Sequence, residues 1–146
     1  MTPVGRLTTL HSFCAPGAPS CTDGNYPNAS LLQATTGEFY GTDTGGGYSS
    51  SSGTVFSLNL GLGPFVRAQQ ASGRAGDLVI ILGTDLAGTT SVTFNGTPAA
   101  YRVVSKSEIG ATIPAGAASG RIAVVAPKGI APFALLSNVP FHVTEF

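Results

Sequence analysis

SVTFNGTPAAYRVVSKSEIGATIPAGAASG, residues 91–120, is the stretch of the chain that decides the fold. Val92 and Phe94 alternate with polar neighbours, as they do in a strand with one buried face. Asn95 and Gly96 then supply the two residues of positive φ that a type I′ hairpin turn requires. Ala99, Tyr101 and Val103 resume the alternation after the turn, so the first part of the stretch predicts a β-hairpin with these residues in its second strand.

The remainder of the stretch predicts further strands. Apolar side chains recur at every second position in two runs, Ala99, Tyr101 and Val103 and then Ile109, Ala111 and Ile113. Pro114 cannot donate to a ladder of hydrogen bonds, so it ends the second run. Because only short turns separate the runs, we expect a meander of antiparallel strands.

The composition is that of a folded chain with little charge. The 146 residues fit one ordinary domain or two small modules, and 42% of them are hydrophobic. Charged residues make up only 10%, against about 25% in typical soluble domains. Seven basic and seven acidic residues cancel, and no basic cluster occurs, which argues against a nucleic-acid partner.

The cysteines and the low charge predict an oxidising compartment. Cys14 and Cys21 flank the segment CAPGAPSC, whose proline and glycine residues let the chain turn back, so a disulfide is expected. A metal site is the weaker alternative, because neither His11 nor His142 completes a Cys/His ligand pattern. The 20 glycines, the 10 prolines and the many serine and threonine residues are typical of secreted bacterial β-proteins. We expect an extracellular or cell-surface location.

The sequence predicts no membrane span and no leader within the chain. No run reaches the 18 apolar residues of a membrane helix. The opening MTPVGRLTTLHSF lacks a basic region followed by an apolar one, so we expect the targeting segment of an exported protein to lie upstream.

Two modules are predicted, residues 1–64 and residues 65–146. Gly61-Leu62-Gly63-Pro64 separates a half rich in serine, threonine and glycine from a half rich in valine, isoleucine and alanine. Strand signals recur about every 8 to 12 residues in the second half, which is the pattern of an all-β sandwich. Its other expected strands are residues 65–69, 77–82, 120–126 and 141–143.

The second module resembles a known family in four places. The motifs are the opening G-x-x-V-x-I-x-G-T-x-L from Gly76 to Leu86, the hairpin V-x-F-N-G, the strand end I-x-A-x-I-P-A-G and the closing Phe141-His142-Val143. Together they resemble an IPT/TIG domain, over about residues 65–146. That resemblance implies an immunoglobulin-like β-sandwich.

The first module carries a different set of motifs. They are Leu10-His11-x-Phe13, Asp23-Gly24-x-x-Pro27, residues 37–42 (GEFYGT), Gly45-Gly46 and residues 53–58 (GTVFSL). Over about residues 5–60 they resemble one unit of the GloVer tandem repeat of bacterial exported proteins. Chains of that type usually carry many units, whereas one unit is expected here, with the CAPGAPSC loop as an insertion.

One repeat cannot bury its apolar face without a neighbour. Something must cover Phe39, Val55, Phe56 and Leu58. We therefore expect a small strand-rich lobe that packs on the sandwich or on another copy of the chain, and self-association through this lobe is one expected outcome.

Candidate catalytic residues are few. His142 lies between Phe141 and Val143 on an expected strand, so it should point away from the core, and a structural hydrogen bond is the simplest role for His11. No G-x-S-x-G motif occurs. The carboxylates are spread along the chain: Asp23, Glu38, Asp43, Asp77, Asp85, Glu108 and Glu145. Of these, Asp77 and Asp85 occupy turn positions, where turn formation explains them.

Two binding interpretations concern the first module. Calcium takes hard oxygen ligands, which Asp23-Gly24-Asn25, Asp43 and the loop Gly45-Gly46-Gly47 could supply, although glycine-rich turns explain the same residues. Three tyrosines could form a platform for sugar rings, although packing between strands is their commoner role: Tyr26, Tyr40 and Tyr48.

The sequence favours a non-catalytic extracellular module for binding, adhesion or spacing, with a protein or glycan partner at the cell surface. No catalytic, cofactor or metal residue is assigned. The first alternative is a small hydrolase of an ester, lactone or glycan, assisted by calcium or not, with its site at His11, Asp23, Glu38 and Asp43. The second alternative is a carbohydrate-binding module.

Overall fold

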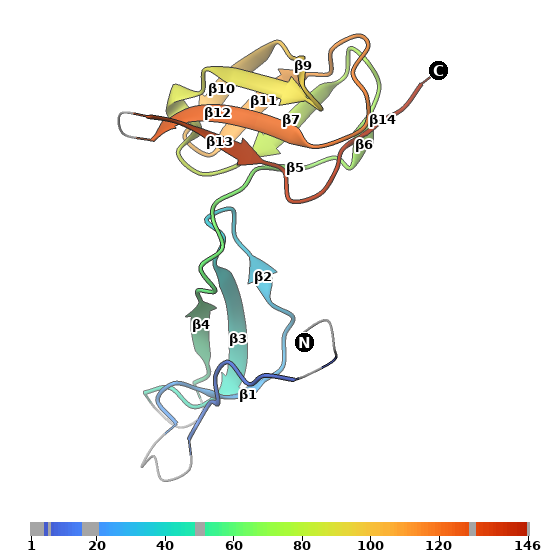
Figure 1. The fold of residues 1–146 in the computed structure, drawn as a ribbon. Helices are drawn as coiled ribbons and strands as arrows, with labels where there is room; N and C mark the ends of the chain where they lie inside the picture. Colours follow the sequence, from blue (N-terminus) through green and yellow to red (C-terminus); the bar gives the residue numbers. More distant parts are fainter. Residues whose placement is uncertain (1–4, 6, 16–20, 49–51, 129–130, 146) are drawn as a thin grey trace. The chain divides into compact units, whose positions relative to one another are not determined.

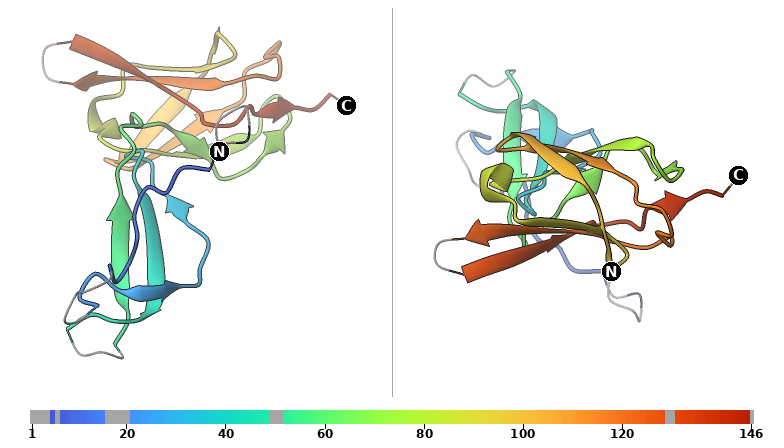
Figure 2. Two further views of the ribbon diagram at one scale, coloured as in Figure 1. Left: turned by 60° about the horizontal axis from the view of Figure 1, so that its bottom comes forward. Right: turned by 90° about the horizontal axis from the view of Figure 1, so that it is seen from above.

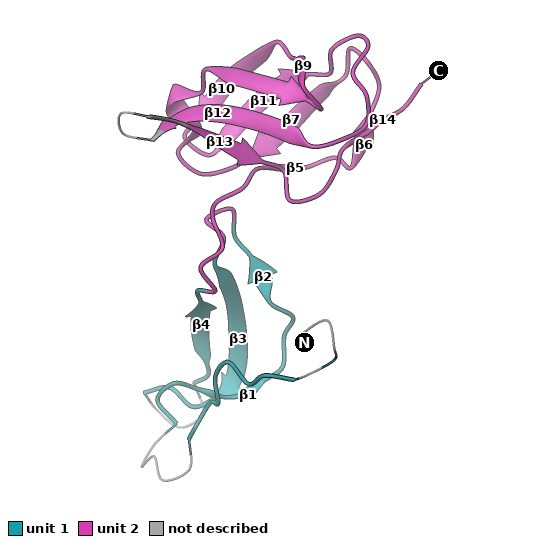
Figure 3. Ribbon diagram, viewed as in Figure 1, with its two compact units in different colours: residues 1–34, 38–59 teal, residues 35–37, 60–146 magenta. Residues whose placement is uncertain are grey.

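The structure is a computed structural model that describes residues 5, 7–15, 21–48, 52–128 and 131–145 (Figure 1). Regular structure in these residues is almost entirely β-strand, so the predicted all-β class is confirmed. The chain divides into two compact units (Figure 3). Unit 1 comprises Met1–Ala34 and Glu38–Asn59, and unit 2 comprises Thr35–Gly37 and Leu60–Phe146.

Unit 2 is a sandwich of two antiparallel sheets, seen from three directions in Figures 1 and 2. The first sheet has the order β10 (Tyr101–Ser105), β11 (Glu108–Thr112), β7 (Leu78–Leu82), β5 (Arg67–Ala68). The second has the order β13 (Ala131–Leu136), β12 (Ile122–Lys128), β8 (Ser91–Phe94), β9 (Thr97–Pro98). A parallel pair, β14 (His142–Val143) with β6 (Ser72–Gly73), completes the unit.

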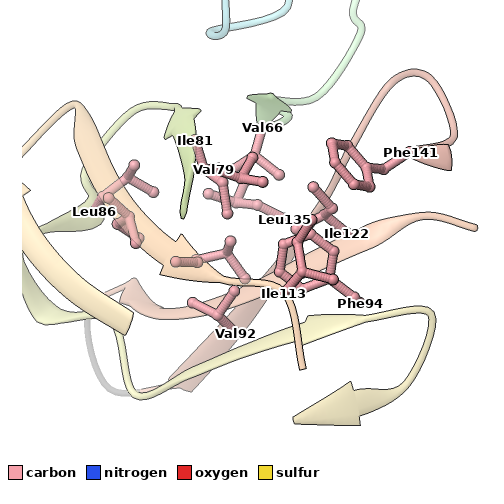
Figure 4. Close-up of a cluster of buried hydrophobic side chains, with 13 residues drawn as sticks. Val66, Val79, Ile81, Leu86, Val92, Phe94, Ile113, Ile122, Leu135 and Phe141 are labelled. Carbon is pink, nitrogen blue, oxygen red and sulfur yellow. The ribbon is translucent and has the colours of Figure 1, made fainter. Parts of the chain in front are cut away.

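The core lies between the two sheets. It forms because successive side chains of a strand point to opposite faces, so every second apolar residue faces the other sheet. Each inner strand buries alternate side chains: Val79 and Ile81 on β7, Ile109 and Ala111 on β11, Val92 and Phe94 on β8, Ile122 and Val124 on β12. Figure 4 shows most of them converging with Val66, Leu86 and Phe141. The alternation expected for residues 109–113 and 120–126 is confirmed.

The predicted turn at Asn95-Gly96 is confirmed, and so is the antiparallel pairing of residues 101–105 with residues 108–112. The prediction that residues 99–103 pair with residues 92–94 is wrong. Asn95 and Gly96 have φ of 47° and 88°, and β8 pairs with β9 across this turn. The chain then leaves the sheet: the Ala99 amide donates to the Val92 carbonyl at 2.9 Å, whereas the Ala100 carbonyl accepts from Thr112 of the first sheet at 2.8 Å.

Strand β10 therefore pairs with β11 in the other sheet. The physical reason is burial, because this switch packs Tyr101 and Val103 against the core between the sheets. If residues 99–103 had instead formed a further strand beside β9, Tyr101 and Val103 would belong to the second sheet. The Tyr101 hydroxyl also donates to the Thr89 carbonyl at 2.9 Å, which satisfies the polar end of this side chain.

One polar side chain is buried inside the described part of unit 2, and its hydrogen bonds are satisfied. The Ser137 hydroxyl donates to the Val139 carbonyl at 2.7 Å and accepts from the Ile122 amide at 3.1 Å. The Arg121 guanidinium donates to the Ser137 carbonyl at 2.6 Å. Ser137 thus ties the end of β13 to the start of β12, which is a structural role.

Unit 1 is a single four-stranded sheet. Its central strand is β3 (Phe39–Gly45), which pairs with β4 (Thr54–Leu58) along one edge. The other edge pairs with β2 (Leu32–Gln33) and β1 (Asn25–Pro27) at its two ends. Among the described residues, every large apolar side chain of the buried core belongs to unit 2. The buried side chain of unit 1 is a carboxylate, Asp43, with 6% of its surface exposed.

The core assignment predicts unequal effects for two substitutions on β7. Ile81 is fully buried, whereas 61% of Leu78 is exposed. Ile81→Ala should lower the free energy of unfolding of the sandwich by about 2–5 kcal/mol, because it removes packed methyl groups and leaves a cavity. Leu78→Ala, the matched control, should change it by about 0.5 kcal/mol at most. Urea denaturation followed by circular dichroism measures both, and equal losses would contradict the assignment.

Candidate functional site

Unit 1 contains a groove of about 730 Å³ beside strand β4. One wall is the extended segment of residues 8–13, and the other is β4 itself. Pro27, Ala29 and Leu31 line it further, together with Thr22 and Asp23. This volume lies within the range of about 300–1,000 Å³ that is usual for ligand pockets.

A histidine and a carboxylate meet at this groove. His11 Nε2 lies 3.2 Å from Asp23 Oδ2, and both side chains are partly open to solvent, at 52% and 42%. The Cys14 amide donates to the same carboxylate, at 3.1 Å from Oδ1. This backbone hydrogen bond is the main reason why the pKa of Asp23 lies below its ordinary value, and the contact with His11 lowers the pKa further.

A row of three rings forms the apolar part of the groove. The ring of His11 meets that of Phe13 edge to face, with 4.7 Å between centroids and 83° between planes. Phe13 in turn lies 4.7 Å from Phe56 on β4. Such contacts fix ring orientations and cover apolar surface. The row therefore attaches the segment of residues 8–13 to the sheet.

The predicted disulfide supports this arrangement. Cys14 and Cys21 are bonded to each other in the structure, with 4.5 Å between their Cα atoms. The Cys21 carbonyl accepts from the amides of Gly24, at 3.1 Å, and Gly47, at 2.8 Å. Because Cys14 donates to Asp23, the bridge holds this donor next to the carboxylate that orients His11.

Asp43, which the sequence left open as a calcium ligand without assigning it, makes structural hydrogen bonds in this geometry. Its carboxylate accepts from both the amide and the hydroxyl of Thr54 on β4, each at 2.9 Å. It also lies against the backbone of Gly24, where any β-carbon would overlap it. Within the described part of the chain, no three His, Cys, Asp or Glu side chains gather as a metal site would require.

Glu38 lies away from the His11–Asp23 pair. Its carboxylate accepts from the Tyr40 hydroxyl at 2.9 Å, and this negative charge raises the pKa of Tyr40 above its ordinary value. Glu38 and Asp43 are five positions apart along β3 and the residue before it, which corresponds to about 17 Å in extended chain. Of the four residues proposed for a hydrolase, His11 and Asp23 contact each other through their side chains. Asp43 lies near Asp23 through the Thr54 hydroxyl, which donates to the Asp43 carboxylate and lies 3.5 Å from the Asp23 carbonyl.

The three tyrosines are exposed, as a sugar platform would need. Tyr40 projects from the face of β3 opposite to that of Asp43, and Tyr26 and Tyr48 are more exposed still. In unit 2, His142 is exposed while its neighbour Phe141 is buried, as the strand period predicts.

Two contacts of the groove were not predicted from the sequence. They are the packing of Phe13 against Phe56 and the pairing of Thr54 with Asp43. The alternation of Thr54, Phe56 and Leu58 along β4 is the signal that could have suggested one shared face.

A family model described as the IPT/TIG domain matches residues 64–143. The chain belongs to the IPT/TIG family. The match spans the sandwich described above and leaves all of unit 1 outside it. No sequence among curated proteins matches the chain. In the described residues, no helix has the length and apolar character needed to cross a membrane.

One solved structure is similar to the chain. It is the crystal structure of a protein of Bacteroides thetaiotaomicron VPI-5482, described as a putative phosphatase, with 22% identity and a TM-score of 0.47. The similarity covers 55% of this chain and 18% of that one, so the chain spans less than a fifth of its length.

The geometry at Asp23 predicts how its titration depends on the disulfide. The Cys14 amide is the largest cause of the low pKa of Asp23, so losing the bridge that holds this donor should raise the pKa toward its ordinary value. We expect this rise in the double variant Cys14→Ser with Cys21→Ser, measured by ¹³C NMR titration of the carboxyl group. His11→Gln should raise the pKa less, and the reverse order would contradict the assignment.

Proposed function

We propose that the protein is a non-catalytic binding module of a bacterial exported protein that acts outside the cell or at its surface. The observation that carries this proposal is a difference between the two units: one has a filled interior, and the other has an open groove. The IPT/TIG sandwich fills its interior with apolar side chains, whereas unit 1 leaves a groove with polar and aromatic walls open. The sandwich is then the scaffold, and unit 1 presents the binding surface.

The proposal includes the two modules expected from the sequence, residues 1–64 and 65–146. The first is proposed to be one GloVer-type repeat unit. The described residues of unit 1 form no buried core of large apolar side chains. This observation supports the assignment, because repeat units of this kind complete their cores with neighbouring units. Leu32, on β2, and Val55, on β4, are exposed apolar side chains that would be covered by self-association or by a protein partner.

An oxidising location is supported by the disulfide. Cys14 and Cys21 form the one bridge of the described residues, and the chain has no further cysteine. Bridges of this kind persist mainly in extracellular and periplasmic proteins. The low proportion of charged residues, 10%, accords with the same location.

The hydrolase alternative is favoured by one feature, the hydrogen bond that Asp23 makes with His11. A carboxylate in this position orients a histidine for proton transfer in many hydrolases. The other two residues named for this alternative serve different partners, because Asp43 accepts from Thr54 and Glu38 from Tyr40. The non-catalytic proposal is therefore the better supported one.

Hydrolysis assays test the proposal. We expect the native chain and His11→Gln to release p-nitrophenol from p-nitrophenyl acetate and p-nitrophenyl glycosides at the same rate, with or without calcium. The reason is that a proton acceptor alone, without a nucleophile held beside it, gives little rate enhancement. His142→Gln is the matched control, since it removes an exposed histidine of unit 2. Turnover that falls with His11→Gln and not with the control would overturn the proposal in favour of the hydrolase.

A further inference from the structure

We propose that the groove between residues 8–13 and β4 binds a neutral saccharide, and that His11 is its main polar contact. This inference deepens the proposed function and rests on it, because it names the ligand class of the binding surface in unit 1. It concerns a different surface from the three exposed tyrosines.

The chemistry of the walls fits a ligand with hydroxyl groups on its rim and an apolar face. Threonine residues line the groove at four positions, Thr8, Thr9, Thr22 and Thr54, and the hydroxyl of Thr54 already donates to Asp43. Hydroxyl groups both donate and accept hydrogen bonds, so they match the hydroxyls of a sugar in either role. Apolar residues line the groove as well, among them Leu10, Phe13 and Phe56.

The charge of the groove argues against the other common ligand classes. The described residues that line it include no lysine or arginine, the usual partners of phosphate and carboxylate ligands. Among the same residues the acidic side chain is Asp23, and its carboxylate is already engaged by His11 and the Cys14 amide. A cationic ligand would have to compete with both partners, whereas a neutral ligand displaces neither.

His11 is oriented for a neutral partner. When Nε2 donates to Asp23 and the imidazole is neutral, the other ring nitrogen, Nδ1, accepts. When the imidazole is protonated, Nδ1 donates, so a neutral hydroxyl matches either form. The edge contact with Phe13 fixes the plane of the ring, and 52% of the side chain remains exposed, so it is accessible. A sugar hydroxyl can donate to this nitrogen while the apolar face of the sugar ring packs on Phe13 or Phe56.

The alternative occupant is an uncharged extended peptide. In the part of the chain that the structure describes, β4 pairs with β3 alone, and such edge strands can add a further strand through backbone hydrogen bonds. A peptide bound in this way would depend on the backbone of β4, and the side chain of His11 would be secondary. This difference separates the two occupants.

Binding of saccharides to the full chain, residues 1–146, tests the inference. The probes are the neutral hexasaccharides of β-1,4-glucose, β-1,4-mannose and β-1,4-N-acetylglucosamine, followed by saturation-transfer NMR and calorimetry. We expect at least one probe to bind, and His11→Gln to weaken its binding about tenfold or more, as the loss of one well-placed hydrogen bond does. Thr22→Val should also weaken binding, because it removes a hydroxyl and keeps the shape of the side chain.

Two controls show whether the groove itself is responsible for binding. His142→Gln should leave binding unchanged, because this exposed histidine lies in unit 2. Circular dichroism of each variant should match the native chain, because His11→Gln leaves the Phe13–Phe56 contact and the Cys14–Cys21 bridge in place.

Three results would overturn the inference. The first is no binding of any probe at about 10 mM, which is weaker than specific recognition requires. The second is binding that His11→Gln leaves intact and Tyr40→Ala abolishes, which would place the sugar on the tyrosines. The third is binding of a polyalanine peptide that displaces the saccharide and that is equally tight in the native chain and in His11→Gln. This result would assign the groove to peptides paired with the β4 edge. None of these results produces His11-dependent hydrolysis, which is the outcome that would overturn the proposed function itself.

Discussion

Burial of one apolar face against another is the interaction on which unit 2 depends. Each sheet of the sandwich presents its alternate valine, isoleucine and phenylalanine side chains to the other, and the strands β7, β8, β11 and β12 supply most of them. Removing apolar surface from water contributes about 25 cal/mol per Å², so two matched faces can offset the entropy of ordering the chain. Ser137 is accommodated there because both its donor and its acceptor are paired.

The described residues of unit 1 lack this interaction, and this difference explains why unit 1 has an open groove. It has one sheet, and its buried side chain is Asp43, which is held by Thr54 instead of by an opposing layer. Ring contacts between Phe13 and Phe56 and the Cys14–Cys21 bridge supply further attachments. Because the described residues leave the face beside β4 without a second layer, a groove remains, and the candidate binding residues line it.

The sequence predicts local features well where a short-range rule governs them. The Asn95-Gly96 turn and the alternation of Ile122, Val124 and Ala126 both follow from neighbouring residues alone. The switch between sheets at Ala99 and Ala100 could not be predicted in this way, because residues 12 or more positions away decide it. The His11–Asp23 pair likewise depends on a turn and a disulfide that bring distant residues together.

The central claim is that unit 2 carries a complete core and unit 1 does not, and native-state hydrogen exchange tests it most directly. We predict that amides of β7, β8, β11 and β12 exchange only through global unfolding of the sandwich. Amides that pair β3 with β4 should instead exchange through a separate opening of lower free energy. Equal protection of the two sets, with the same dependence on denaturant, would contradict this claim.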